Sequence, residues 1–251
     1  MAARNNADWY AAMFDVHDLR YERSTAAFRA IDTPPPYFSW MTILEPVPSQ
    51  VLLDLVTKEA SRSEFGLKDS FHTLDLESLG LTELFTATWI WASETPGVDS
   101  LGWHRVTSIE DLSTWEQAWK DGGSPSDQRQ FPDSVLDRQD LAFWGRASGS
   151  GFDAGAVANL SLDCVGMSNV FGSNAMPAAA MLCAGFGPGL PVVGYEHGDG
   201  LAEALEVGFE PVGHLRVCGK QEERPTSVPV GLPAVSECAA VRVRRPEAGE
   251  P

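Results

Sequence analysis

Hydrophobic and polar positions between Leu190 and Cys218 predict a strand, a helix and a second strand. The run 191–195 is short, apolar and bounded by Gly and Pro, which is typical of a buried strand. The helix over 199–207 ends at Gly208, where a left-handed residue is favoured. Its apolar stripe consists of Leu201, Ala202, Ala204 and Leu205. The second strand begins near Val212 and returns the chain to a sheet.

The preceding segment predicts a strand, a helix, three strands and another helix. Trp103 to Val106 has the pattern of a short strand, and Ser108 stands at the cap of the helix that follows. The three strands are expected over 141–147, 155–162 and 165–171, and the small residues at 148–151 mark a hairpin between the first two. The next helix is expected over 177–183.

The N-terminal region has its own sequence of elements. Residues 1–33 predict a helical segment that ends before a run of prolines, and 37–44 predicts a strand. Ser49 caps a further helix, and a short helix over 75–79 ends at Gly80 before a strand over 84–91. Lys68, Asp69 and Ser70 are interpreted as a cap before that short helix.

The two units that end in glycine are comparable. Aligning Gly80 with Gly208 places Leu84, Ala87 and Trp89 on Val212, Leu215 and Val217. Two interpretations stay open: two related halves in one chain, or a pattern common to any helix–glycine–strand unit. The expected organisation is an N-terminal region over 1–97, a second domain over 98–220 and a flexible tail over 221–251.

The order of elements from Trp103 to Lys220 resembles that of the GNAT family of N-acetyltransferases. The Gly208–Phe209 pair, preceded by an acidic, Ala-rich helix, carries this resemblance. It implies an α/β fold with a mixed, mostly antiparallel sheet flanked by helices, and the N-terminal region is either a second GNAT-like half or an elaboration. It also implies transfer of an acyl group from acetyl-CoA or another acyl-CoA to the amine of a small molecule.

The family holds the CoA pyrophosphate on a Gly-rich turn, Q/R-x-x-G-x-G/A, before a helix. Unpaired N–H groups at a helix N-terminus attract such anions. The corresponding segment here, 168–181, has Gly172 but no Gln or Arg at its start. The resemblance places the cofactor on Ser168, Asn169, Val170, Phe171, Gly172, Ser173 and Asn174, although an ordinary turn explains the later residues equally well. Ser168 and Asn169, with Asn159, are polar in predicted strands, where lining a site and bonding within the structure are equal alternatives.

The resemblance also fixes where a general acid is expected. Family members often carry a Tyr four residues before the Gly–Phe glycine, and here that residue is Ala204. Tyr195, Glu196 and His197, at the end of the preceding strand, are the candidate replacements. Each of them is also compatible with an ordinary loop role.

Charge and cysteine spacing restrict the partners. A net charge of −17 disfavours nucleic acid and anionic membrane surfaces and suits a small amine. The four cysteines are scattered without a metal-binding spacing, so no metal is expected. Without an apolar leader or a long apolar run, a cytoplasmic location is predicted, and a homodimer is left open. The alternatives to an acyltransferase are a non-catalytic ligand- or partner-binding protein and a biosynthetic enzyme with a different thioester chemistry.

Overall fold

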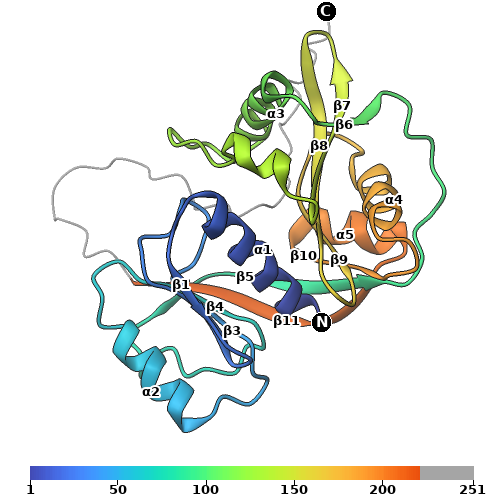
Figure 1. The fold of residues 1–251 in the computed structure, drawn as a ribbon. Coiled ribbons are helices and arrows are strands. Elements are labelled where there is room, and N and C mark those ends of the chain that lie inside the picture. The colour runs from blue at the N-terminus through green and yellow to red at the C-terminus, as the bar shows by residue number, and fades with distance from the viewer. Residues whose placement is uncertain (221–251) are drawn as a thin grey trace, which may run out of the picture.

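A computed structural model describes residues 1–220, which form one open sheet flanked by helices (Figure 1). The sheet has eleven strands in the order β1-β2-β3-β4-β11-β5-β10-β9-β8-β7-β6. The strands are β1 (Tyr21–Arg23), β2 (Ala27–Ala30), β3 (Met41–Ile43), β4 (Gly66–Asp69), β5 (Thr82–Ala92), β6 (Trp103–Arg105), β7 (Leu141–Ser148), β8 (Gly151–Leu160), β9 (Val165–Phe171), β10 (Val192–Glu196) and β11 (Glu210–Gly219). The α-helices are α1 (Ala2–Val16), α2 (Gln50–Glu59), α3 (Ile109–Asp121), α4 (Met176–Phe186) and α5 (Gly198–Val207).

Most neighbouring strands are antiparallel, and two pairs are parallel. β3 pairs in parallel with β4, and β9 with β10, each across a helical connection. The predicted mixed, mostly antiparallel sheet flanked by helices is therefore confirmed.

β5 and β11 lie side by side at the centre of the sheet (Figure 1). Each of them also pairs with a strand from the other part of the chain. β5, from the N-terminal region, pairs with β10, while β11, from the C-terminal end, pairs with β4. The sheet thus shows a β–α–β parallel pair on each side of a central antiparallel pair. This order fits the hypothesis of two related halves, which stays a prediction.

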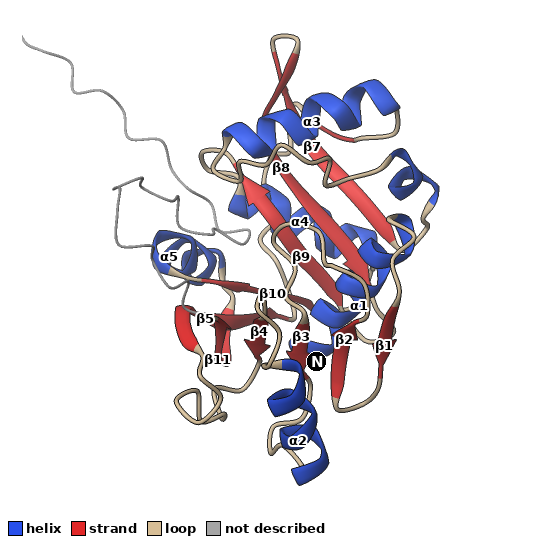
Figure 2. Ribbon diagram, turned by 90° about the vertical axis from the view of Figure 1, so that its left-hand side faces the viewer, coloured by secondary structure: helices blue, strands red, loops and turns tan. Residues whose placement is uncertain are grey.

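Helices cover both faces of the sheet. α1 and α3 pack on one face, in a core that includes Phe14, Trp115 and Val157. α4 and α5 pack on the other face with Ile90 and Val192 of the sheet, and α2 covers the N-terminal end of that face. Figure 2 shows α3 crossing β7 and β8. The face that carries α1 is called the α1 face below.

Local signals in the sequence are confirmed at several element ends. Ser49 and Ser108 accept hydrogen bonds from the backbone N–H groups of Leu52 and Asp111, as helix caps do. Gly208 has φ 105° at the end of α5, in the left-handed region. The compared residues of β5 and β11 also agree in burial: Leu84 and Val212 are exposed, whereas the other four are buried.

Other expectations are wrong. The helix predicted to reach residue 33 ends at Val16, and β1 and β2 form an antiparallel hairpin after it. Residues 75–79 form turns, not a helix, and the predicted cap at Lys68 and Asp69 belongs to β4. Of the apolar stripe of α5, Ala204 is buried and Leu201 half-buried, while Ala202 and Leu205 are exposed, because only one edge of this short helix meets α4.

Cys164, Cys183 and Cys218 are buried free thiols. Burial raises the pKa of Cys164 and Cys218 to about 12, so both stay protonated at neutral pH. The predicted flexible tail and Cys238 lie outside the described residues. No helix within residues 1–220 has both the length and the apolar character needed to cross a membrane.

Candidate functional site

The sheet opens between β9 and β10. The two strands pair in parallel only at their first residues, Val165 with Val192 and Gly166 with Val193. Gly194 follows on β10, where a Cβ atom would lie 2.8 Å from the carbonyl oxygen of Met167. The absence of a side chain at Gly194 therefore lets the two backbones approach closely at the point where their pairing ends.

β9 carries a bulge at the same level. Its pairing with β8 passes from Ser168 to Phe171 while β8 advances only from Val157 to Gly155. Asn169, inside the bulge, has φ 53°, a left-handed conformation that asparagine tolerates better than most residues. Bulges disrupt the ladder locally, so the backbone of 169–170 has no register partner on β8. The regular pairing of β9 with β8 is therefore interrupted at these two residues.

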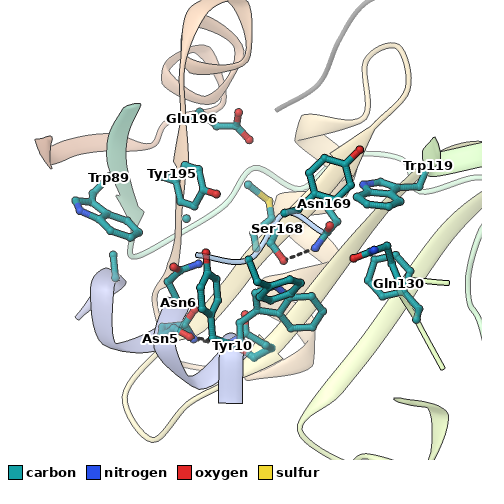
Figure 3. Close-up of a pocket in the computed structure, with 18 residues that line it drawn as sticks. Asn5, Asn6, Tyr10, Trp89, Trp119, Gln130, Ser168, Asn169, Tyr195 and Glu196 are labelled. Carbon is teal, nitrogen blue, oxygen red and sulfur yellow. Dashed lines mark hydrogen bonds between the residues drawn. The ribbon is translucent and has the colours of Figure 1, made fainter. Parts of the chain in front are cut away.

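A small cavity of about 40 Å³ lies at this opening (Figure 3). It has room for about three water molecules or a compact group such as an amine or a thioester carbonyl. Its polar lining residues come from α1, from two loops and from the strands β8, β9 and β10: Asn5, Asn6, Tyr10, Tyr37, Gln130, Asn159, Ser168, Asn169, Tyr195 and Glu196. The predicted residues Ser168, Asn169, Tyr195 and Glu196 are therefore brought together at one site.

Glu196 is the acidic group of this cavity. The residue is 5% exposed, and within residues 1–220 its Oε2 atom has no hydrogen-bond partner. Burial raises the pKa of Glu196 to about 8, because a carboxylate in an apolar surrounding loses its hydration. Gly200 of α5 lies against the same oxygen. Perturbed carboxyl groups in cavities are common at catalytic sites.

Tyr195, the neighbour of Glu196 on β10, meets a buried lysine. Its hydroxyl oxygen lies 3.4 Å from the Nζ atom of Lys68, which also donates to Asn6 Oδ1 at 3.0 Å. The same ammonium lies 4.6 Å from the centre of the Tyr195 ring and 4.8 Å from that of Tyr10. These cation–π contacts help to keep a charged side chain inside the fold. Sequence reasoning missed Lys68, because it assigned the residue to a cap.

Two further polar groups, Gln130 of the loop after α3 and Asn159 of β8, line the cavity. Gln130 is buried, and its Nε2 atom has no hydrogen-bond partner in the described part of the chain. Its backbone N–H donates to Glu116 of α3, which holds the surrounding loop in place. Asn159 exchanges hydrogen bonds with Asn5 of α1, donating to one backbone carbonyl and supplying another. Asn159 therefore has both of the roles that the sequence left open.

The turn before α4 holds the remaining cofactor candidates. Val170 and Phe171 are buried in the cores on the two faces, so only their backbone is available to a ligand. Gly172, Ser173 and Asn174 are exposed, and α4 has no side-chain cap at its N-terminus. Arg146 of β7 donates to the Ser173 carbonyl oxygen at 3.3 Å. Sequence reasoning missed this basic neighbour, because 27 residues separate the two positions.

Acidic residues face this turn from α5. A hollow between α4 and α5 is lined by Asn174, Pro177, Asp199, Glu203 and Glu206, with small apolar residues. The uncapped N-terminus of α4 suits one phosphate group. The carboxylates of the hollow oppose a second or third phosphate. The β9 edge thus fits the thioester end of an acyl-CoA better than the hollow fits its nucleotide end.

His197 lies outside the cavity. It is exposed at the start of α5, where its ring is 5.5 Å from that of Phe85. Across residues 1–220, no three His, Cys, Asp or Glu side chains form a group that could hold a metal ion.

Comparisons with known proteins identify the fold. No protein-family model matches the sequence, and no curated protein matches it significantly. The structure is similar to a GCN5-related N-acetyltransferase from Kribbella flavida, with a TM-score of 0.56 and 14% identity over 88% of this chain and 95% of that one. It is also similar to a putative GNAT acetyltransferase from Novosphingobium aromaticivorans, with a TM-score of 0.52 and 14% identity over 84% and 96% of the two chains. A functionally unknown protein from Staphylococcus epidermidis gives a TM-score of 0.53 at 11% identity, over 81% and 94%. At this low identity the likeness concerns the architecture, and the chain has the GNAT fold.

Proposed function

We propose that the protein transfers an acyl group from an acyl-CoA to the amine of a small molecule. The observation that carries the proposal is the opening between β9 and β10, where the bulge at Asn169 and the buried Glu196 carboxyl line one cavity. A reaction there would bring a thioester and an amine together away from bulk water, which lowers the entropic cost of their encounter.

The β9 bulge would activate the thioester. The backbone N–H of Val170, which lies in the bulge without a register partner on β8, can donate to the thioester oxygen as negative charge develops on it. Such a fixed donor needs no reorganisation during the reaction, and the low polarity around the cavity strengthens its effect.

Glu196 and Tyr195 would move the protons. The amine nitrogen attacks the carbonyl carbon, the new C–N bond forms and the C–S bond breaks. Ionised Glu196 accepts the proton that leaves the nitrogen, and the Tyr195 hydroxyl protonates the departing thiolate. Because the pKa of Glu196 is about 8, the fraction of ionised base would rise through mildly alkaline pH. His197 has no role in this scheme.

A second candidate function is binding without catalysis. Ala204, at the position where the family often carries a Tyr, is fully buried in α5 and supplies no proton. Glu206 and Asp199 also line the hollow in which a CoA diphosphate would be expected. These features favour a protein that keeps the fold and binds a ligand in the cavity without transferring an acyl group.

Thiol release distinguishes these functions. Acetyl-CoA and S-acetylpantetheine, which lacks the nucleotide, are each incubated with a mixture of primary amines. We expect release of free thiol by the wild type and about 100-fold slower release by Glu196→Gln. Glu210→Gln, which changes an exposed acid at the start of β11, is the matched control and keeps the wild-type rate. Saturable binding of a thioester without release would support the second candidate, and no binding of either thioester would contradict acyl transfer.

A further inference from the structure

A larger apolar groove lies beside the cavity on the α1 face. Its volume is about 590 Å³, and it runs between the start of α1 and the centre of the sheet. Its apolar side chains include Leu44, Phe71, Trp89, Trp91, Val193 and Val212. Val212 is 54% exposed, so part of the groove wall is open to solvent. We call this hollow the apolar groove.

The apolar groove and the cavity share a wall. Trp89 of β5 and Ala2 of α1 line both of them. The Trp89 indole N–H donates to the Ser70 carbonyl oxygen at 2.8 Å, and its ring meets Tyr195 edge to face. A fixed aromatic side chain thus forms the boundary between the groove and the residues proposed to move protons.

The apolar groove and the turn at 172–174 lie on different faces of the sheet. Trp89, Trp91 and Val193 belong to the core on the α1 face. The turn at 172–174 leads into α4, which packs on the other face. Two substrates that react in one small cavity need separate approaches, and the apolar groove and the turn at 172–174 lie on opposite faces of the sheet.

The chemistry of the groove is apolar. Among residues 1–220, no carboxylate lines the groove, and its charged groups come from Arg4 and the N-terminal Met1. The lining thus contrasts with the chain as a whole, whose net charge is −17. Burying an apolar body there gains the hydrophobic free energy of its surface, whereas a charged body would lose hydration without an acidic partner.

We infer that the apolar groove binds the hydrocarbon or aromatic body of the acceptor, whose primary amine reaches past Trp89 into the cavity beside Glu196. The inference rests on the proposed function and specifies its acceptor as an amphipathic amine. The acyl chain of the donor and a second copy of this chain are the competing occupants.

Direct titration of amines tests this inference without a thioester. The affinities of n-propylamine, n-hexylamine and n-octylamine are measured by calorimetry. We expect the dissociation constant to fall by about threefold to fourfold for each added methylene that enters the groove. A dissociation constant that does not depend on chain length overturns the inference.

A variant that fills the groove gives the second measurement. Val212→Trp places a large side chain at an exposed groove position, and Leu162→Trp places one at a turn residue that is 99% exposed and outside the groove. We expect Val212→Trp to abolish the gain from chain length while propylamine binds as before, and Leu162→Trp to behave as the wild type. If Val212→Trp instead weakens octanoyl-CoA, or dissociates a dimer seen by sedimentation, the groove has another occupant. Chain-length-dependent amine binding without thiol release supports this inference and rejects the proposed transfer.

Discussion

The Glu196 carboxyl group packs directly against Gly200, in the first turn of α5. A Cβ atom at Gly200 would lie 2.6 Å from the Oε2 atom of Glu196, closer than real side chains approach. The glycine thus sets where the carboxyl group can lie. Since an oxygen at the end of a flexible side chain can move, a methyl group would shift the carboxyl group more readily than it would unfold the helix.

Gly200→Ala should therefore separate activity from stability. Alanine favours a helix over glycine by about 1 kcal/mol, so the melting temperature should hold or rise, while thiol release falls because Glu196 is displaced. Gly185→Ala is the matched control, since Gly185 lies in α4 and a Cβ there meets nothing within 4 Å. Its stability should rise with unchanged activity. Equal activity in both variants would show that the position of Glu196 does not matter.

The buried carboxyl of Glu196 should also make stability depend on pH. Its pKa is raised from 4.5 to about 8, so between these values the folded protein holds a proton that the unfolded chain has released. The contribution of the protonated Glu196 to the free energy of unfolding is therefore fully present below pH 4.5, and it is lost as pH rises to about 8. Relative to wild type, Glu196→Gln should gain stability across this range, by a few kcal/mol in order of magnitude. Denaturant unfolding at pH 5 and pH 8 measures it, with Glu210→Gln as control. If the difference in unfolding free energy between Glu196→Gln and wild type is the same at both pH values, the raised pKa is contradicted.

Gly172 should be essential to the turn before α4. It has φ +92°, and a Cβ atom there would lie 2.2 Å from the Asp153 carbonyl oxygen. Gly149 has φ +59° in the hairpin between β7 and β8, with nothing within 4 Å of its Cβ position. Gly149→Ala should cost about 1–2 kcal/mol for the left-handed conformation alone, and Gly172→Ala about 1–3 kcal/mol more for crowding. If chemical denaturation shows equal losses of unfolding free energy for the two variants, the backbone around Gly172 and Asp153 can move apart without cost.

The acids of α5 should weaken CoA binding. Glu206→Gln removes one negative charge from the hollow beside Asn174, and acetyl-CoA should then bind about twofold or more tightly at low salt. The gain should shrink as salt screens the charges. S-acetylpantetheine, which has no diphosphate, should bind both proteins equally. A gain of the same size for both thioesters would exclude an effect through the phosphates.

The sequence predicted those parts of the fold that depend on local signals. The hairpin and meander of β7, β8 and β9 follow from alternating residues and small turn residues, and Ser49, Ser108 and Gly208 mark helix ends by their own chemistry. Tyr195 and Glu196 were found because they stand at the end of an apolar strand. Their place at one cavity with Ser168 and Asn169 followed from the family resemblance, not from the spacing of the residues.

The missed parts depend on partners far away in the chain. Lys68 and Asp69 have charged side chains, which are atypical of a buried strand. Lys68 is held by Asn6 and two tyrosine rings, and Asp69 pairs with Arg216 of β11. Gln130 reaches the cavity because Glu116 of α3 binds its backbone. Local pattern cannot show that β5 enters the sheet between β10 and β11, since that order is set by pairing across more than 100 residues.

The most direct test of the account is the pH dependence of thiol release from S-acetylpantetheine, with n-octylamine as acceptor, in wild type and Glu196→Gln. Because Glu196 must be ionised to accept the amine proton, the wild-type rate divided by the Glu196→Gln rate, a ratio in which the protonation of the free amine cancels, should rise about tenfold per pH unit below the pKa of Glu196 and level off near pH 8. Glu196→Gln should be slow and lack this inflection. A wild-type rate that falls through pH 8, or an unchanged profile in Glu196→Gln, would contradict the role of Glu196 as the base.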